Sequence, residues 1–458
     1  MHESVIPASG GASVPLRPVD QAGLAALEGR TMRIATAQNF KAKPGEILPL
    51  FDDQGQLEMV LFGAGEPMSA RALPARLPAA DYSLEPGGPE INPSLFALAF
   101  ALGSYRFDRY RPRPDGPRVR LVAPAGADIK GSLEIAAACA LARDMVNTPA
   151  QDMGPLQIET IAREIAESAG AELGVISGEA LLEQNYPLVH AVGRAAAPHR
   201  APRMIEIGWR LDRADAPMVV LVGKGVVFDS GGLNIKPGSG MRWMKKDMGG
   251  AAHALALARL IMKADLPVRL VVLTPAVENA ISGDAFRPGD VFTSRAGLTV
   301  EIGNTDAEGR LILADALARA GELKPDLTLD FATLTGAARV ALGPDLPPFY
   351  TRDDALAAEL EAHAKSQADP IWRMPLWSGY GDSIDSEIAD VRNDSAEWAQ
   401  AGSVTAALFL ERFAPASGSW AHFDIFAWNP RARPGFPMGG EAQAIRAAFA
   451  MLKTRFSR

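Results

Sequence analysis

Residues 218–232 read MVVLVGKGVVFDSGG, and this stretch decides the fold of the larger part of the chain. Met218 to Val222 is an unbroken apolar run that ends at Gly223, which is the pattern of a strand buried on both faces. Lys224 and Asp229 follow among glycines, so charged side chains come directly after the strand. Strands buried on both faces are typical of sheets that helices cover on each side.

Strands and helices alternate on the C-terminal side of this stretch. The expected elements are a helix at Ala251 to Met262, a strand at Val268 to Leu273, a strand at Leu298 to Ile302, a helix at Leu311 to Ala320 and a strand at Leu327 to Ala332. This alternation predicts an α/β fold with a mostly parallel central sheet flanked by helices. In such sheets, functional residues lie beyond the C-terminal ends of the strands.

The N-terminal part carries no catalytic motif. Prolines and glycines interrupt it at 112–117 and 124–126, with a short strand predicted at Val119 to Val122 between them, and an alanine-rich helix at Ile135 to Val146 follows. Because 458 residues exceed one ordinary core, two domains are expected. We predict a smaller N-terminal α/β domain at 1–127, a connecting helix at 128–150 and a catalytic domain at 151–458.

Composition narrows the class of protein. The single cysteine, Cys139, excludes an intramolecular disulfide and favours a reducing compartment. The first ten residues lack the basic start and apolar run of a signal peptide, and no apolar stretch reaches the length of a membrane span. A formal charge of −8 disfavours a protein that coats nucleic acid. We therefore expect a cytoplasmic globular protein that does not enter a membrane.

Three segments concentrate acidic residues and lysines among glycines. They are GKGVVFDSGG at 223–232 with Lys236 shortly after, MKKDMGG at 244–250, and NTDAEGR at 304–310, which opens a helix. Carboxylates are hard oxygen ligands suited to magnesium, manganese or zinc, and four of them can bridge a pair of ions. Two ions roughly 3.5–4 Å apart can polarise a carbonyl and deprotonate a water between them.

Other readings of these segments are weaker. The six histidines are scattered, and neither an H-E-x-x-H nor a G-x-S-x-G motif is present, so zinc–histidine and serine mechanisms have no motif here. The phosphate-loop spacing fails at Gly223 to Gly225, and the calcium-loop spacing fails at Asp306 to Gly309. A single acid such as Asp306 could simply favour the helix N-terminus, but three such segments together favour a site.

The sequences of these segments resemble those of the leucyl aminopeptidase family, whose members are dinuclear zinc or manganese peptidases and typically hexamers. The most specific match is NTDAEGRL, Asn304 to Leu311. Further matching strings are ARDMVNTP at 142–149, VEN at 277–279, RPGD at 287–290 and ATLTGA at 332–337. The match runs from residue 142 to near the C-terminus, and residues 1–127 fit the family's variable N-terminal domain, with an oligomeric or regulatory role, in length and position.

The resemblance implies a role for each matching residue. It implies one ion held by Lys224, Asp229, Asp247 and Glu308, and a more exchangeable ion held by Asp229, Asp306 and Glu308. Lys236 would polarise the scissile carbonyl, and Arg310 would hold a bicarbonate that acts as general base. A neutral Lys224 amine is needed for ligation, and Asp247 would steer the free amine of a peptide substrate.

One region departs from the family pattern. Where the family shows a strand reading D-I-A-G, this chain reads HFDIFAWN at 422–429, which places Phe426 and Trp428 where smaller side chains are common. These aromatics could pack in the core. The sharper hypothesis is a reshaped pocket for the first substrate side chain, with altered preference. Its predicted lining residues are Met244, Thr333, Leu334, Gly336 and Phe426, together with Asp247.

A non-catalytic alternative stays open at this point. Tyr105 to Arg113 mixes arginines with aromatics, as in some nucleic-acid binders. Residues 1–127 nevertheless hold 13 basic and 13 acidic residues, so no net field supports nucleic acid binding. The leading hypothesis is a metal-dependent aminopeptidase that acts on peptides with a free N-terminus, and a homohexamer is expected from the resemblance. The alternative is a DNA-binding or scaffold protein that keeps the metal site.

Overall fold

The computed structural model describes residues 4–8, 11–112, 118–395 and 397–457, and the chain forms two compact units. The N-terminal unit comprises residues 1–140 and 429–438, and the C-terminal unit comprises 141–428 and 439–458. The connecting segment contains the long helix α4 (Ile129–Asn147). The domain boundaries at 127 and 150 stay a prediction. Most of the interruption expected at 112–117, and Arg113 with it, lies outside the described residues.

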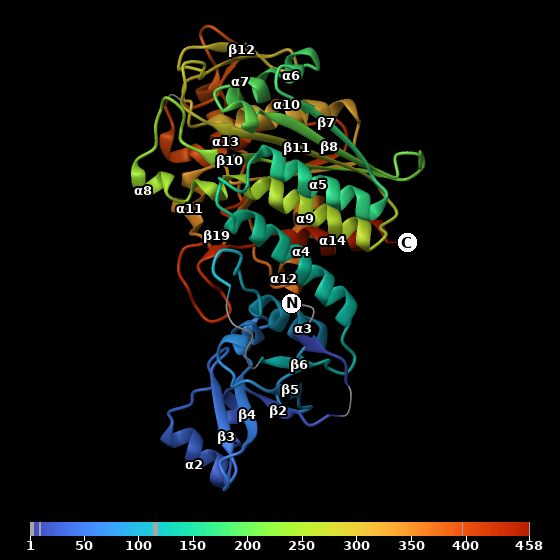
Figure 1. Cartoon of the computed structure of the whole chain (residues 1–458), viewed down its shortest axis with the longest axis vertical. Coiled ribbons are helices and arrows are strands. Elements are labelled where there is room, and N and C mark those ends of the chain that lie inside the picture. The colour runs from blue at the N-terminus through green and yellow to red at the C-terminus, as the bar shows by residue number, and fades with distance from the viewer. Residues whose placement is uncertain (1–3, 9–10, 113–117, 396, 458) are drawn as a thin grey trace. The chain divides into compact units, whose positions relative to one another are not determined.

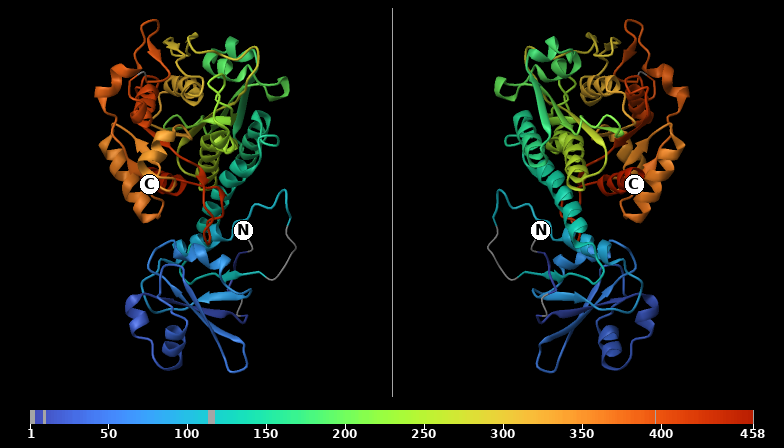
Figure 2. Two further views of the ribbon diagram at one scale, coloured as in Figure 1. Left: turned by 90° about the vertical axis from the view of Figure 1, so that its left-hand side faces the viewer. Right: turned by 90° about the vertical axis from the view of Figure 1, so that its right-hand side faces the viewer.

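The N-terminal unit is built on a six-stranded sheet. Its strand order is β1 (Val5–Ile6), β6 (Arg120–Val122), β5 (Asp81–Leu84), β2 (Val14–Val19), β4 (Leu57–Gly63) and β3 (Ile47–Phe51). The strand expected at 119–122 is confirmed as β6. The short helices α1 (Gln21–Ala25) and α2 (Gly29–Ala37) lie beside the blue strands in Figure 2, and α3 (Pro93–Gly103) begins at the Asn92 cap.

The C-terminal unit is built on a larger mixed sheet. Its order is β16 (Trp372–Arg373), β15 (Pro348–Tyr350), β18 (Ser419–Asp424), β14 (Leu327–Ala332), β9 (Met218–Gly223), β11 (Arg269–Asn279), β8 (Arg203–Trp209) and β7 (Glu172–Ser177), with β10 (Gly225–Asp229) also paired to β11. The central strands β18, β14, β9 and β11 run parallel, whereas β15, β8 and β7 run antiparallel to neighbours. The predicted α/β fold with a parallel centre is confirmed.

Helices cover both faces of this sheet, as the upper part of Figure 1 shows. One face carries α5 (Pro155–Ala169) and α9 (Gly249–Lys263), and α14 (Ile445–Phe456) packs on α9. The other face carries α7 (Pro187–Gly193) and α10 (Glu308–Glu322), with α13 (Gly402–Glu411) packed on α10. The remaining helices of this unit are α6 (Ala180–Glu183), α8 (Gly238–Met241), α11 (Gly336–Leu342) and α12 (Asp354–Ser366). Within the described residues, no helix is both long enough and apolar enough to cross a membrane.

One expected strand belongs to a different sheet. The run at 298–302 forms β13 (Thr299–Glu301), which pairs with β12 (Val291–Thr293) and β17 (Val391–Arg392) in a separate three-stranded sheet. The placement in the central series was therefore wrong. The physical reason is that only Val300 of this strand is fully buried, so the strand covers one edge of the unit and does not need helices on two faces.

Candidate metal centre

The three acidic segments meet at the C-terminal edge of the central sheet. Lys224 follows β9, and Asp229 ends β10. Asp247 lies in the 3₁₀ turn η3 (Met244–Met248) directly before α9. Glu308 is the first residue of α10, and Asp306 lies two residues before it. The carboxyl ends of parallel strands share one edge of a sheet, which brings these residues together from distant parts of the sequence.

Three carboxylates converge on one point. One oxygen atom each of Asp229, Asp306 and Glu308 lies within 4.8 Å of the other two. Asp229 and Glu308 are buried, and Asp306 is partly exposed. The second oxygen of Asp229, Oδ1, accepts hydrogen bonds from Gly231 N and from Asn279 Nδ2, each at 2.9 Å. These bonds orient Asp229, and the converging oxygens form a hard donor set that suits a divalent cation.

Lys224 and Lys236 each contact two of the carboxylates. Lys224 Nζ lies 2.6 Å from Asp247 Oδ2 and 3.0 Å from Glu308 Oε1. Lys236 Nζ lies 2.8 Å from Asp229 Oδ2 and also pairs with Asp306. Burial alone lowers the pKa of both lysines, but the surrounding carboxylates outweigh it and hold each pKa above its ordinary range. Without a metal, the two ammonium groups therefore supply the positive charge at this site.

Glu308 is the least compensated carboxylate of the group. Burial, followed by the nearby charge of Asp229, raises the pKa of Glu308 to about 8, and the same causes raise that of Asp306 to about 6. Glu308 Oε1 pairs with Lys224 Nζ at 3.0 Å, whereas Oε2 has no hydrogen-bond partner among the residues that the structure describes. Such a buried acceptor is costly unless something satisfies it. A cation at this point satisfies it, so the residues fit a metal.

Glycines allow this close packing. A Cβ atom built on Gly309 would lie 2.5 Å from Lys224 Cε, and one built on Gly250 would lie 2.1 Å from Phe331 O. Any side chain at Gly309 would therefore push Lys224 away from Glu308. The segments are rich in glycine for a steric reason. At these positions the backbone lies directly against the Lys224 side chain or against another backbone segment, which leaves no room for a side chain.

Arg310 is the third residue of α10, and among the described residues no ion pair is formed by its side chain. The side chain is buried, its pKa is lowered by burial to about 10, and Nε has no hydrogen-bond partner among the described residues. Its guanidinium carbon lies 6.0 Å from the ring centroid of Phe409. An arginine with a pKa of about 10 remains cationic at neutral pH. A buried cation with an unused donor is suited to a small planar anion.

Sequence reasoning assigned no role to several neighbours of the ligands. Asn279 donates to Asp229 Oδ1 and, at 3.1 Å, to Thr305 O, and it belongs to the matching string VEN. Lys246 is buried and donates to Asp247 Oδ1 at 3.0 Å. The sequence offered one indication of this contact, because Lys246 directly precedes Asp247 in the string MKKD. The indication is weak, since lysines usually extend their charged ends into solvent.

The predicted substrate-pocket residues lie in four segments of the C-terminal unit. Thr333 follows β14, and its hydroxyl donates to Asp247 Oδ1 at 2.9 Å. Met244 is buried in η3, and Phe426 is buried in the turn after β18. Leu334 donates its backbone N–H to Asp424, and Gly336 begins α11 and is exposed. Thr333 therefore contacts Asp247, which is a proposed metal ligand. The assignment of these residues to a substrate pocket stays a prediction.

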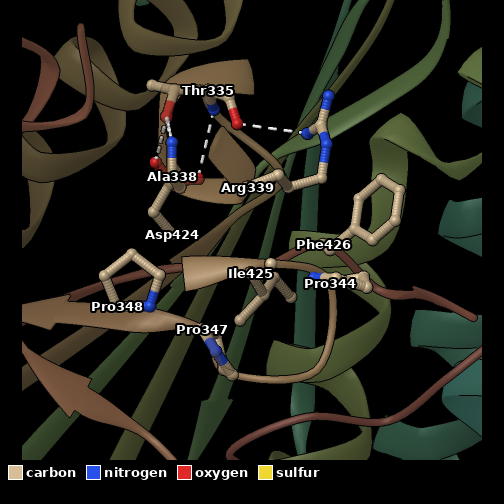
Figure 3. Close-up of a pocket in the computed structure, with 10 residues that line it drawn as sticks. Thr335, Ala338, Arg339, Pro344, Pro347, Pro348, Asp424, Ile425 and Phe426 are labelled. Atoms are coloured by element: carbon tan, nitrogen blue, oxygen red, sulfur yellow. Dashed lines mark hydrogen bonds between the residues drawn. The ribbon is translucent and has the colours of Figure 1, made fainter. Parts of the chain in front are cut away.

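The two aromatics of the departing segment are both buried. Trp428 is 7% exposed, and its ring stacks on that of Trp243 with centroids 6.2 Å apart. Phe426 is 6% exposed and lines a recess with Thr335, Arg339 and Asp424, shown in Figure 3. Burial is compatible with both readings, core packing and pocket wall.

Two family models match the chain. The model for the cytosol aminopeptidase family, catalytic domain, matches residues 140–448, and the model for the M17 aminopeptidase N-terminal domain matches residues 14–124. A probable cytosol aminopeptidase of Syntrophotalea carbinolica is 41% identical over 77% of this chain and 73% of its own length. One of Chlorobium luteolum is 36% identical over 91% of this chain and 89% of its own.

Solved structures of similar chains agree with these matches. The cytosol aminopeptidase of Coxiella burnetii is 43% identical, covers 99% of both chains and superposes with a TM-score of 0.92. The bottromycin maturation enzyme BotP, solved in complex with Mn, is 33% identical, covers 98% of this chain and 100% of its own, and superposes with a TM-score of 0.86. Both domains of the chain therefore have counterparts in known proteins.

Proposed function

Because the chain belongs to the cytosol aminopeptidase family and is a metal-dependent peptidase of that family, we propose that it holds two divalent ions and cleaves N-terminal residues from peptides. The observation that carries this proposal is the convergence of Asp229, Asp306 and Glu308 within 4.8 Å. The first ion is assigned to Lys224, Asp229, Asp247 and Glu308. The second is assigned to Asp229, Glu308 and both the side chain and backbone carbonyl of Asp306.

Manganese or zinc is the proposed metal, with magnesium possible for an oxygen-rich site. The Mn complex of BotP supports manganese. When bound, such a pair of ions supplies Lewis-acid polarisation of the scissile carbonyl and a water of lowered pKa. Lys224 must lose its proton to serve as a ligand, so its proton loss would be coupled to metal binding. Its contacts with Asp247 and Glu308, two other proposed ligands, support this role.

Lys236 is proposed as the electrophile. Its side chain is 15% exposed, so the ammonium is at the edge of the site and is not sealed within it. The carboxylates around it keep its pKa high, so it is cationic at neutral pH. A fixed positive charge at this place stabilises the negative charge that develops on the carbonyl oxygen during attack.

Arg310 is proposed to hold a bicarbonate that acts as general base. An arginine cannot take up the proton of water because it is already protonated. Its planar guanidinium can, however, hold a planar anion through parallel hydrogen bonds, and the unused Nε is available for one of them. An anion held by Arg310 would supply the general base that the arginine itself cannot provide.

The substrate must carry a free amine if Asp247 steers it. We expect leucine 4-nitroanilide to be hydrolysed when manganese or zinc is present, and N-acetyl-leucine 4-nitroanilide to be hydrolysed roughly 10³-fold more slowly or not at all, because acetylation removes the basic nitrogen. Release of 4-nitroaniline is followed for both compounds under identical conditions. Comparable rates would reject the aminopeptidase assignment.

The same protein preparation also distinguishes the aminopeptidase from the alternative function. Tight, metal-independent duplex DNA binding with no hydrolysis of either compound would favour a DNA-binding or scaffold protein. The homohexamer and the cytoplasmic location that the family resemblance implies stay predictions. The pocket for the first substrate side chain is proposed to include Met244, Thr333 and Phe426, with Leu334 and Gly336 at its rim.

A further inference from the structure

The turn that carries Phe426 is held by one side chain from another part of the chain. β18 ends at Asp424, and Ile425 N makes the next sheet-type bond, to Ala332 O at 2.8 Å. We propose that Gln443 is a positioning residue for substrate specificity: it fixes the turn at 425–428 and thereby sets the place of Phe426. This inference rests on the proposed function, in which Phe426 forms part of the wall of the substrate pocket.

The side-chain amide of Gln443 makes three hydrogen bonds, two to the turn and one to a neighbouring segment. Its Oε1 accepts from Phe426 N and from Ala427 N, each at 3.0 Å. Its Nε2 donates to Pro344 O at 2.8 Å. Gln443 is buried, so water cannot replace these bonds easily. Both N–H groups of the turn therefore depend on this side chain.

The turn also has an unusual backbone and a tight neighbour. Ala427 has φ 55°, in the left-handed region that residues other than glycine seldom adopt. A Cβ atom built on Gly249 would lie 2.6 Å from Ala427 Cβ and 2.9 Å from Thr333 Cγ2. The turn therefore packs directly on the first residue of α9, two residues after Asp247. Such a conformation persists only where the surroundings determine it. Here Gln443 accepts from Ala427 N, and Glu441 N donates to Ala427 O at 3.0 Å.

His253 anchors Gln443 from the other side. Its Nε2 accepts from Gln443 N at 3.0 Å, and its Nδ1 donates to Gly249 O at 2.6 Å. This pattern requires the neutral ring, and burial lowers the pKa of His253 to about 4, which keeps the ring neutral over the working range. His253 lies on α9, so the chain of contacts runs from the start of α9 through His253 and Gln443 to Phe426.

The Phe426 ring faces two cations of the site region. The guanidinium carbon of Arg339 lies 4.4 Å from the ring centroid, as Figure 3 shows for the two side chains, and Lys246 Nζ lies 5.7 Å from it. Lys246 in turn donates to Asp247 Oδ1. A turn that loses its hydrogen bonds would let this ring move, which changes the space beside Asp247 without removing a proposed ligand.

The test measures kcat and KM for the 4-nitroanilides of alanine, leucine, methionine and phenylalanine. Gln443→Leu removes the three side-chain bonds at similar volume. We expect it to change the ratio of kcat/KM between leucine and alanine by about fivefold or more, chiefly through KM, with metal content unchanged. Phe426→Ala should also change this ratio, and the double variant should add little to Phe426→Ala because both act through the same ring.

Two further variants make the result specific. Gln443→Glu keeps the acceptor for Phe426 N and Ala427 N, so we expect a ratio near that of the wild type. Gln157→Leu is the matched control, because Gln157 also accepts a backbone N–H, from Gly154 at 2.9 Å on α5, and its loss should leave the ratio unchanged. If Gln443→Leu does not fold, Gln443→Asn, with a shorter side chain, is expected to show the same shift.

The possible failures are distinct. A wild-type chain that hydrolyses none of the four compounds with metal present overturns the proposed function. Suppose instead that the wild type is active and that Phe426→Ala changes the leucine-to-alanine ratio of kcat/KM. If a folded Gln443 variant then leaves this ratio unchanged, only the role of Gln443 is overturned. A Phe426→Ala variant with a strong, unchanged leucine preference removes Phe426 from the pocket, and the positioning role is overturned with it.

Discussion

Glu308→Ala is expected to abolish hydrolysis of leucine 4-nitroanilide, lowering kcat/KM by roughly 10³-fold or more. Glu308 is assigned to both ions, so its loss removes a bridging ligand from each. The carboxylate is buried, and its Oε2 has no hydrogen-bond partner among the described residues, so alanine leaves this ligand position without a donor oxygen. Turnover and bound metal are measured on the same sample, and both should fall together.

The fold of this variant should survive. Because the pKa of Glu308 is raised from 4.5 to about 8, the metal-free folded chain holds this carboxyl protonated at pH values where the unfolded chain ionises it, and the resulting cost in folding free energy grows as the pH rises from 4.5 towards 8. Removing the carboxylate also removes that cost. Glu322→Ala, near the C-terminal end of the same helix α10, is the matched control with normal activity. Wild-type turnover in Glu308→Ala would contradict the ligand assignment.

Lys236→Ala is expected to lower kcat by roughly 10²–10³-fold while metal content and KM change little. Lys236 contacts Asp229 and Asp306 but is assigned to no ion, so its loss should spare metal binding and remove the charge that stabilises the oxyanion. Steady-state kinetics and metal analysis together distinguish this outcome from the loss of a ligand.

Lys263→Ala, at the end of α9, is the matched control for the loss of a lysine charge. It should keep wild-type kcat. If Lys236→Ala also kept it, Lys236 would have no part in the chemical step. If Lys236→Ala lost its metal, Lys236 would belong with the residues that hold the ions, and the division of roles between Lys224 and Lys236 would be wrong.

Long apolar runs made much of the fold predictable from the sequence. The run at 218–222 is β9, because it is apolar throughout and buried on both faces. Residues 327–332 form β14, which is buried on both faces as well, although Thr328 and Asp330 alternate with its apolar residues. The run at 298–302 was assigned to the wrong sheet. A strand of three residues carries too little pattern to show which sheet it joins, and its partners β12 and β17 are as short.

The acids and lysines of the site were predictable because each follows a recognisable strand or opens a helix. The groups that support them were not. Gln443 contacts Phe426 from a segment without any motif, and its other partner, His253, is 190 residues away in the sequence. Such contacts depend on how α9 and the last segment of the chain pack, which no local pattern encodes.

The central claim is that one chain binds two catalytic metal ions, and titration of metal-free protein tests it most directly. After removal of metal with a chelator, manganese or zinc is added back while bound metal and hydrolysis of leucine 4-nitroanilide are measured on the same samples. We expect no activity without metal and full recovery as binding saturates at two ions per chain, whereas Glu308→Ala should not recover. Activity that persists without metal, or that saturates with a single ion, would contradict it.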